Sequence, residues 1–320
     1  MYKDLYKGAA MPTDIKIAAP QQIGPIQVWP LMWERLVSHQ RNLPTGVGDL
    51  IFEEYEEEDV GPVINWIQVT NPTEFPVFIP AGWIVSEGLL QDRILVAAEY
   101  IEPESTNTIL VSCVEKGRWE PSEVHRGTQR APMSVMGAGF DFDSNKGLWV
   151  MDSKTRQERV WRQVDRQEDR SGERPTHSLA QIMQEDANSC EIQKNVIKVM
   201  RDSLKIHPQQ NGVLIALNGA PLLSEFFSAP DGISRTVRKT LTAASFDATN
   251  ASNQEAERGD VERFLDEVLR TKIYPLNNED WGVHLSGGTD SLDTHLTKDS
   301  GERLLRMSTL NRSHPALIAV

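Results

Sequence analysis

The chain has 320 residues, 39% of them hydrophobic and 25% charged, which is the composition of a globular protein with one large domain or two medium ones. Its formal net charge of −13 disfavours a broad nucleic-acid footprint, because binding to a phosphate backbone needs clustered Lys and Arg. Two cysteines are too few for a secreted disulfide framework, and neither a signal peptide nor a membrane-length apolar stretch is visible. We therefore expect a cytoplasmic protein that binds neither nucleic acid nor membrane.

The first part of the chain predicts a tail followed by strands. Residues 1–22 are polar and rich in Pro and Ala, and we expect them to be mobile. From residue 23 to residue 119, short apolar runs are separated by Gly-Pro and Asn-Pro turns at the spacing of an all-β domain. Residues 63–70 alternate between an apolar face and a mixed face. This pattern predicts an antiparallel β-sandwich over residues 23–119.

The second part of the chain predicts helices. Residues 120–150 are rich in Gly, Pro and Ser, and predict a long loop. Apolar residues then recur at helical spacing, which predicts a helix-rich part with a few strands over residues 151–310 and a tail over residues 311–320. The fold class is thus α+β. The clearest helix begins at Asp260, placed to cap it, and has an apolar stripe on one face: Val261, Phe264, Leu265, Val268 and Leu269.

One run of residues near the C-terminus looks like a phosphate loop. Ser286-Gly287-Gly288-Thr289-Asp290-Ser291 spells the loop of the ATP pyrophosphatases, in which backbone N–H groups approach a pyrophosphate. That loop opens an α/β domain, whereas little of this chain remains after Ser291 and the residues that follow alternate in polarity. A Gly-Gly hairpin turn is the preferred interpretation.

Metal-ligand patterns are incomplete. Asp141, Asp143, Asn145 and Asp152 fit positions of a calcium loop, but Lys146 stands where the loop needs glycine, which favours a solvated acidic turn. We expect neither a metal site nor a cofactor. No metal-ligand spacing relates the seven histidines, which are His39, His125, His177, His207, His284, His295 and His314.

Cys113 is a potential nucleophile, as a thiolate beside a base would be. It lies in the apolar run of residues 109–114, where a free cysteine behaves as a small core residue. We expect Cys113 to be buried and unreactive, because an apolar environment raises the pKa of a thiol and blocks access to it.

Polar residues gather at the ends of two neighbouring predicted strands. Gln91 and Arg93 begin one strand, and Glu115, Arg118 and Trp119 end the next. Guanidinium groups bind phosphate bidentately, and an indole can stack on a base. Glu115 offsets only one of the two arginines, so the remaining charge favours an anionic ligand. The alternative is structural, with Glu115 pairing with Arg93 or Arg118 across the strands and Trp119 covering the end of the sandwich.

The same region carries a family resemblance. Residues 88–95 spell Gly-Leu-Leu-Gln-Asp-Arg-Ile-Leu, and residues 111–119 spell Val-Ser-Cys-Val-Glu-Lys-Gly-Arg-Trp. They resemble the ADP-ribosylglycohydrolase and rhodanese-phosphatase superfamily-associated protein domain, a bacterial family with similar Gly-x-x-Gln-Asn-Arg and Pro-Val-Ser-Cys-Val-Glu-x-Gly-Arg-Trp stretches. Residues 157–164 are similar to its Gln-x-x-Val-Trp helix, residues 175–176 to its following cap, and residues 212–219 to its strand and turn. The resemblance therefore spans most of the chain.

The resemblance implies a role near NAD or ADP-ribose chemistry, in conflict or repair systems of bacteria or phages. The family is named for its association with ADP-ribose-removing hydrolases and phosphatase-like proteins, which is an association and not a mechanism. It commonly has an acidic residue directly after the glycine matching Gly82, where this chain has Trp83, with Glu87 as the nearest substitute. Its Gln-Asn-Arg stretch has Asp92 at the middle position here.

Two functional hypotheses follow, and the sequence leaves open whether the protein is an enzyme. In the first, the chain is a binding or catalytic module for an ADP-ribose-like or other phosphorylated nucleotide. Arg93 and Arg118 then hold phosphate, while Gln91 contacts a polar edge of the ligand. Trp119 stacks, and Glu115 orients Arg118 or acts as a base. In the second, the protein is a non-catalytic interaction protein that docks a partner enzyme. Residues of a binding site should be partly exposed, whereas structural residues should be paired and enclosed.

Overall fold

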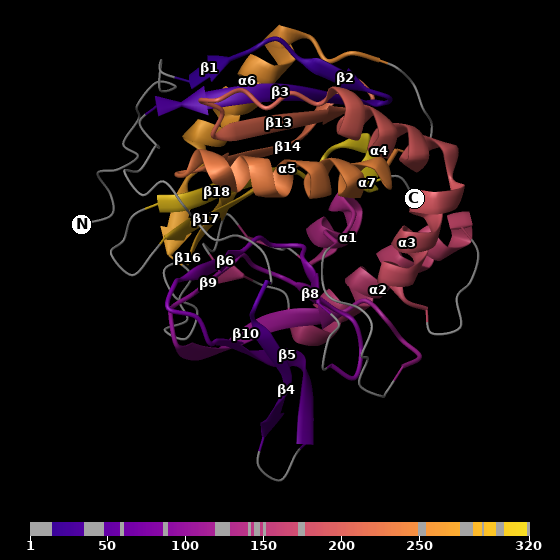
Figure 1. The fold of residues 1–320 in the computed structure, drawn as a ribbon, viewed down its shortest axis with the longest axis vertical. Helices are drawn as coiled ribbons and strands as arrows, with labels where there is room; N and C mark the ends of the chain where they lie inside the picture. Colours follow the sequence, from indigo (N-terminus) through magenta and orange to yellow (C-terminus); the bar gives the residue numbers. More distant parts are fainter. Residues whose placement is uncertain are drawn as a thin grey trace.

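The computed structural model shows an α+β protein with a large sheet at one end and a smaller strand-rich part at the other (Figure 1). All described strand pairs are antiparallel. The structure describes residues 15–34, 48–57, 61–85, 89–118, 129–139, 142–143, 148–149, 152–171, 177–248, 254–275, 284–289, 291–298 and 304–318.

The larger sheet joins strands from both ends of the chain. Its described strands run in the order β1-β3-β13-β14-β18-β17-β16-β15, and β2 pairs with β3. The strands are β1 (Ile15–Ile17), β2 (Gln21–Ile23), β3 (Ile26–Trp33), β13 (Gly212–Leu217), β14 (Ala220–Phe227), β15 (Ile273–Pro275), β16 (His284–Gly288), β17 (Leu292–Lys298) and β18 (Leu304–Asn311).

Strand β13 lies at the centre of the core, and every one of its residues is buried. Its alternate side chains enter two different apolar clusters, because successive residues of a strand point to opposite faces. The hairpin to β14 turns at Asn218 and Gly219, whose φ angles of 50° and 84° fit the type I′ turn that Asn-Gly favours. The strand and turn that the family resemblance implied over residues 212–219 are present.

Helices cover both faces of this sheet. Helix α5 supplies Ile233 and Val237 to the cluster on one face, and α6 supplies Val261 and Leu265 to the cluster on the other. The predicted apolar stripe of α6 is confirmed, but its N-cap is Glu257, and Asp260 lies in the first turn. The described helices are α1 (Met133–Ala138), α2 (Ser153–Ser171), α3 (Leu179–Ser189), α4 (Glu191–Ser203), α5 (Pro230–Ser245), α6 (Arg258–Arg270) and α7 (Pro315–Ile318).

The N-terminal region is rich in strands, as expected, but a sandwich over residues 23–119 is not confirmed. The reason is that β3 pairs with β13 and thereby joins the C-terminal strands. The remaining strands of the region form a separate sheet and a small pair. That sheet has the order β4 (Ile51–Glu57), β5 (Gly61–Asn71), β10 (Ser105–Cys113), β8 (Arg93–Leu95) and β7 (Ile84–Val85), and the small pair is β6 (Val77–Ile79) with β9 (Glu99–Ile101).

Three segments expected to be loop or tail contain regular structure. Strands β1 and β2 lie in the expected N-terminal tail, where both pair with β3. Helix α1 and a short pair, β11 (Phe142–Asp143) with β12 (Leu148–Trp149), lie in the expected long loop. Helix α7 lies in the expected C-terminal tail. Tertiary packing determines the structure of these short segments, because none is long enough for its sequence to show the hydrophobic periodicity of a helix or strand.

The run that resembles a phosphate loop forms a hairpin between β16 and β17. A Cβ atom at Gly287 would lie 2.0 Å from the carbonyl oxygen of Lys272, so glycine is required for the close approach of neighbouring backbone. In the turn, the hydroxyls of Thr289 and Ser291 donate to the Glu267 carboxylate at 3.2 and 3.0 Å. A carboxylate in contact with both hydroxyls repels phosphate. The expected hairpin is confirmed, but Gly287 and Gly288 lie in β16 and the turn follows them at Thr289.

A buried ion network connects the sheet to the segment before α1. Glu225 of β14 accepts two hydrogen bonds from Arg130, at 2.8 and 2.9 Å, and pairs with Arg306 of β18. Each of the three side chains is only 1% exposed. Burial opposes the ionisation of Glu225, but the two guanidiniums outweigh it and lower the pKa of this carboxyl to about 2.

Replacing Glu225 with Gln leaves both arginines buried without their counter-charge. The expected loss of unfolding free energy at pH 7 is about 3–5 kcal/mol, measured by urea denaturation. Glu255→Gln, at an exposed carboxylate, is the control and should change stability by less than about 0.5 kcal/mol.

The contribution of Glu225 to the unfolding free energy decreases as the pH falls. Because the folded-state pKa of Glu225 lies below the ordinary value of 4.5, its contribution is present above pH 4.5 and is lost as the pH falls towards 2. The unfolding free energies of the wild type and of Glu225→Gln should therefore converge as the pH falls from 4.5 towards 2. A difference at pH 7 of less than about 1 kcal/mol would contradict the assigned role of the network.

Candidate functional site

Four of the five residues expected to form a site lie together, and Trp119 lies outside the described residues. Gln91, Arg93 and Glu115 are 2%, 1% and 3% exposed, and the Arg118 side chain is 17% exposed. They occupy the start of β8 and the segment that follows β10, as the sequence predicted. These residues are therefore adjacent but largely enclosed.

Arg118 is held by at least three described partners. Its Nε donates to Glu115 at 3.0 Å, one terminal nitrogen donates to Asp92 at 3.0 Å, and the other donates to the Leu89 carbonyl at 2.8 Å. Asp92 in turn accepts from the Ser178 hydroxyl at 2.7 Å. Ser178 is the N-cap of α3, so this chain of contacts ties the smaller sheet to the helices.

Arg93 has a partner that sequence reasoning did not identify. Its guanidinium lies 3.4 Å from the carboxylate of Glu54, on β4, and donates to Gln91 at 3.3 Å. With Glu54, Asp92 and Glu115 present, the two arginines face three carboxylates, so no positive charge is left over for an anion. This enclosed and paired geometry fits the structural alternative, and a role in ligand binding stays a prediction.

Cys113 is buried, as expected, and burial raises the pKa of its thiol. Its backbone N–H donates to the Gln157 side chain at 2.7 Å, and the Gln157 amide donates to the Cys113 carbonyl at 2.8 Å. The Gln157 side chain of α2 thus satisfies the backbone N–H and carbonyl of Cys113 at the edge of β10, as a neighbouring strand would. This contact gives Gln157 a structural role between α2 and β10.

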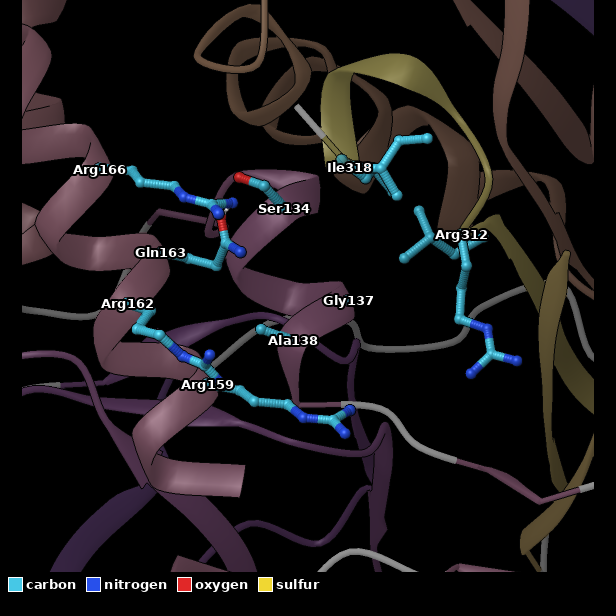
Figure 2. A pocket seen from close by; sticks show the side chains of 11 residues that line it. Ser134, Gly137, Ala138, Arg159, Arg162, Gln163, Arg166, Arg312 and Ile318 are labelled. Atoms are coloured by element: carbon cyan, nitrogen blue, oxygen red, sulfur yellow. Dashed lines mark hydrogen bonds between the residues drawn. The ribbon is translucent and has the colours of Figure 1, made fainter. Parts of the chain in front are cut away.

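The structure contains a pocket of about 330 Å³ that sequence reasoning did not identify. Figure 2 shows the side chains that line it. It lies between α1, α2, α7 and the end of β18. Asp247 fixes α1 there by accepting from the backbone N–H groups of Met133 and Ser134 at 2.6 and 3.3 Å, and burial raises the pKa of Asp247 to about 6. The lining residues are Ser134, Gly137, Ala138, Arg159, Arg162, Gln163, Arg166, Leu310, Arg312, Leu317 and Ile318.

The pocket is strongly basic although the whole chain is acidic. Arg159, Arg162 and Arg166 follow one another at helical spacing along one side of α2, and Arg312 lies on the opposite side of the pocket (Figure 2). None of the described lining residues is acidic. Arg312 is fixed by Asp293 at 3.2 Å, whereas no salt bridge to a described carboxylate holds Arg162 or Arg166, and Arg166 donates to the neutral Gln163 side chain. The helical spacing of the three arginines on α2 was visible in the sequence, but only the folded chain brings Arg312 close to them.

Metal sites are not seen in the described part of the chain, where no three His, Cys, Asp or Glu side chains are grouped to hold an ion. Asp141 and Asn145 of the candidate calcium loop lie outside the described residues, as do His39 and His125. Among the described helices, none has the length and apolar character needed to cross a bilayer.

Fold and pocket together define an α+β protein with antiparallel sheets and a basic cavity of small-molecule size. The model of the ARG and Rhodanese-Phosphatase-superfamily-associated Protein domain matches residues 14–305, so the chain belongs to that family and the resemblance is confirmed. The family is associated with the ADP-ribosylglycohydrolase and rhodanese-phosphatase superfamilies. Neither a curated protein nor a solved structure matches the chain.

The two departures from the family pattern both lie in the core. Trp83 is 1% exposed and forms a β-bridge with Arg130, and Asp92 is fully buried against Arg118. Glu87 lies outside the described residues. Trp83 therefore packs as a core residue.

Replacing Arg118 with Ala tests the enclosed cluster. The change leaves Asp92 and Glu115 buried without their guanidinium, and we expect unfolding free energy to fall by about 3–5 kcal/mol. Arg270→Ala removes an exposed helical pair with Asp266 and should cost no more than about 1 kcal/mol. If Arg118→Ala were as mild as this control in urea denaturation, Arg118 would be available for a ligand.

Proposed function

We propose that the protein binds a phosphorylated small molecule of the ADP-ribose-like nucleotide class in the arginine-lined pocket. The observation that carries the proposal is the set of three α2 arginines facing Arg312 across a cavity with no described acidic lining residue. Guanidinium groups form paired, charge-assisted hydrogen bonds with phosphate oxygens, and two walls of arginines suit a ligand with more than one phosphate.

Size and polarity support the same class of ligand. The volume of about 330 Å³ falls within the range of small-molecule sites, which is roughly 300–1,000 Å³. Leu310, Leu317 and Ile318 supply an apolar wall beside the charged one. Such a wall suits a sugar or base attached to the phosphates. The proposal includes the cytoplasmic location expected from the sequence, and it leaves catalysis open.

The family association favours ADP-ribose among phosphorylated ligands. The family is associated with a superfamily of enzymes that act on ADP-ribose, and such an association narrows the ligand without defining a reaction. ADP-ribose offers a diphosphate for the arginines and a nucleoside for the apolar wall.

The second candidate function is docking of a partner protein, and one observation favours it. The β4–β5 hairpin projects from the body of the molecule (Figure 1). It exposes Ile51 and Ile64, at 49% and 37%. Isolated exposed apolar residues are ordinary, so this observation carries less weight than the pocket.

A double replacement of Arg162 and Arg166 with Ala tests the pocket. ADP-ribose at 100 times its dissociation constant should stabilise the wild type by about 2.7 kcal/mol, seen as a higher melting temperature in a thermal-shift titration. The double variant should lose this shift and keep the unliganded melting temperature, because no described carboxylate forms a salt bridge with either arginine.

Arg201→Ala is the matched control, since it removes an exposed arginine of α4 far from the pocket residues in sequence. It should keep the ligand shift. The proposal fails if ADP-ribose, ADP and pyrophosphate all leave the wild-type melting temperature unchanged, or if the double variant responds as the wild type does.

A further inference from the structure

A second, smaller pocket lies between α3 and α5 and has a volume of about 180 Å³. Met183 and Phe246 contribute apolar surface, and Arg130, Arg238 and Lys239 contribute positive charge. The proposed nucleotide function does not use this pocket, and none of its lining residues lines the arginine pocket described above.

Lys239 differs in its surroundings from the described lysines that form salt bridges. Lys16, Lys116 and Lys194 each form a salt bridge with a carboxylate. The Lys239 ammonium instead lies 4.3 Å from the centre of the Trp83 ring, and no described carboxylate forms a salt bridge with it. The nearby Glu225 is fully engaged by its two arginines.

Two features favour the neutral amine of Lys239 over its ammonium form. Burial lowers its pKa, because the charged form loses hydration. Arg238, exposed in the same pocket, adds positive charge that an ammonium group would face, whereas the charge of Arg130 is offset by Glu225. Desolvation and neighbouring cations are the means by which lysines become nucleophilic towards carbonyl groups.

We propose that Lys239 is a reactive amine that condenses with the carbonyl group of a small anionic aldehyde, such as an open-chain sugar phosphate. Lys239 first releases a proton to solvent, and its nitrogen lone pair then attacks the carbonyl carbon. A C–N bond forms as the carbonyl oxygen takes up a proton, and loss of one water molecule gives the imine. No electrons are transferred to an outside group. Arg238, adjacent to Lys239 on α5 and exposed, binds the anionic group.

Pyridoxal 5′-phosphate with borohydride reduction tests the proposal, since it combines an aldehyde with a phosphate and leaves a stable adduct. Peptide mapping by mass spectrometry over time should show Lys239 modified several-fold faster than Lys198, an exposed lysine of α4. Lys239→Arg keeps the cation over Trp83 and should lose the fast adduct with an unchanged melting temperature.

A comparison of two labelling reagents tests whether Arg238 binds the anionic group. Arg238→Ala should slow labelling of Lys239 by pyridoxal 5′-phosphate but not by pyridoxal, which lacks the phosphate. If Arg238→Ala slowed the labelling of Lys239 equally with both reagents, or slowed it with neither, Arg238 would not be the residue that binds the anionic group. Labelling of Lys239 no faster than that of Lys198 would overturn the whole proposal and leave Lys239 as a structural cation–π partner of Trp83. Neither result bears on nucleotide binding in the arginine pocket.

Discussion

The buried pairing of Glu225 with Arg130 and Arg306 is the contact on which the rest of the structure depends. Arg306 lies on β18, the strand whose end carries Leu310 and leads to Arg312 of the arginine pocket. Arg130 precedes α1, which forms another wall of that pocket, and Arg130 also lines the pocket of Lys239. Three charges inside an apolar core tolerate only one arrangement, because any displacement leaves a buried charge unpaired. The network thereby fixes both pockets relative to the central sheet.

Two of the arginine clusters in the described part of the chain differ in their counter-charges. Around Arg93 and Arg118, each guanidinium has a carboxylate partner and the groups are largely enclosed. Along α2, Arg162 and Arg166 lack a described salt bridge and border an open cavity. The same residue type therefore stabilises the fold in one place and offers charge to a ligand in another. The number of nearby carboxylates, and not the spacing of arginines, separates the two.

Local secondary structure could be predicted from the sequence wherever the pattern of apolar and turn residues was clear. Residues 212–219 resembled a strand and turn of the family, and the stripe on α6 predicted its buried face. The pairing of β3 with β13 could not be read, because register between distant strands is decided by packing across the whole core. The pocket was missed for the same reason: its arginines on α2 were visible, but their position opposite Arg312 exists only in the folded chain.

A crystal structure of the protein with ADP-ribose would test the central claim most directly. We expect electron density for the diphosphate between Arg162 and Arg166 of α2 on one side and Arg312 on the other, with the nucleoside against Leu317 and Ile318. Density for the ligand beside Arg118 instead would contradict this account and support the site that the sequence motif indicated. A crystal soaked at saturating ADP-ribose that shows no ligand in the arginine pocket would contradict it as well.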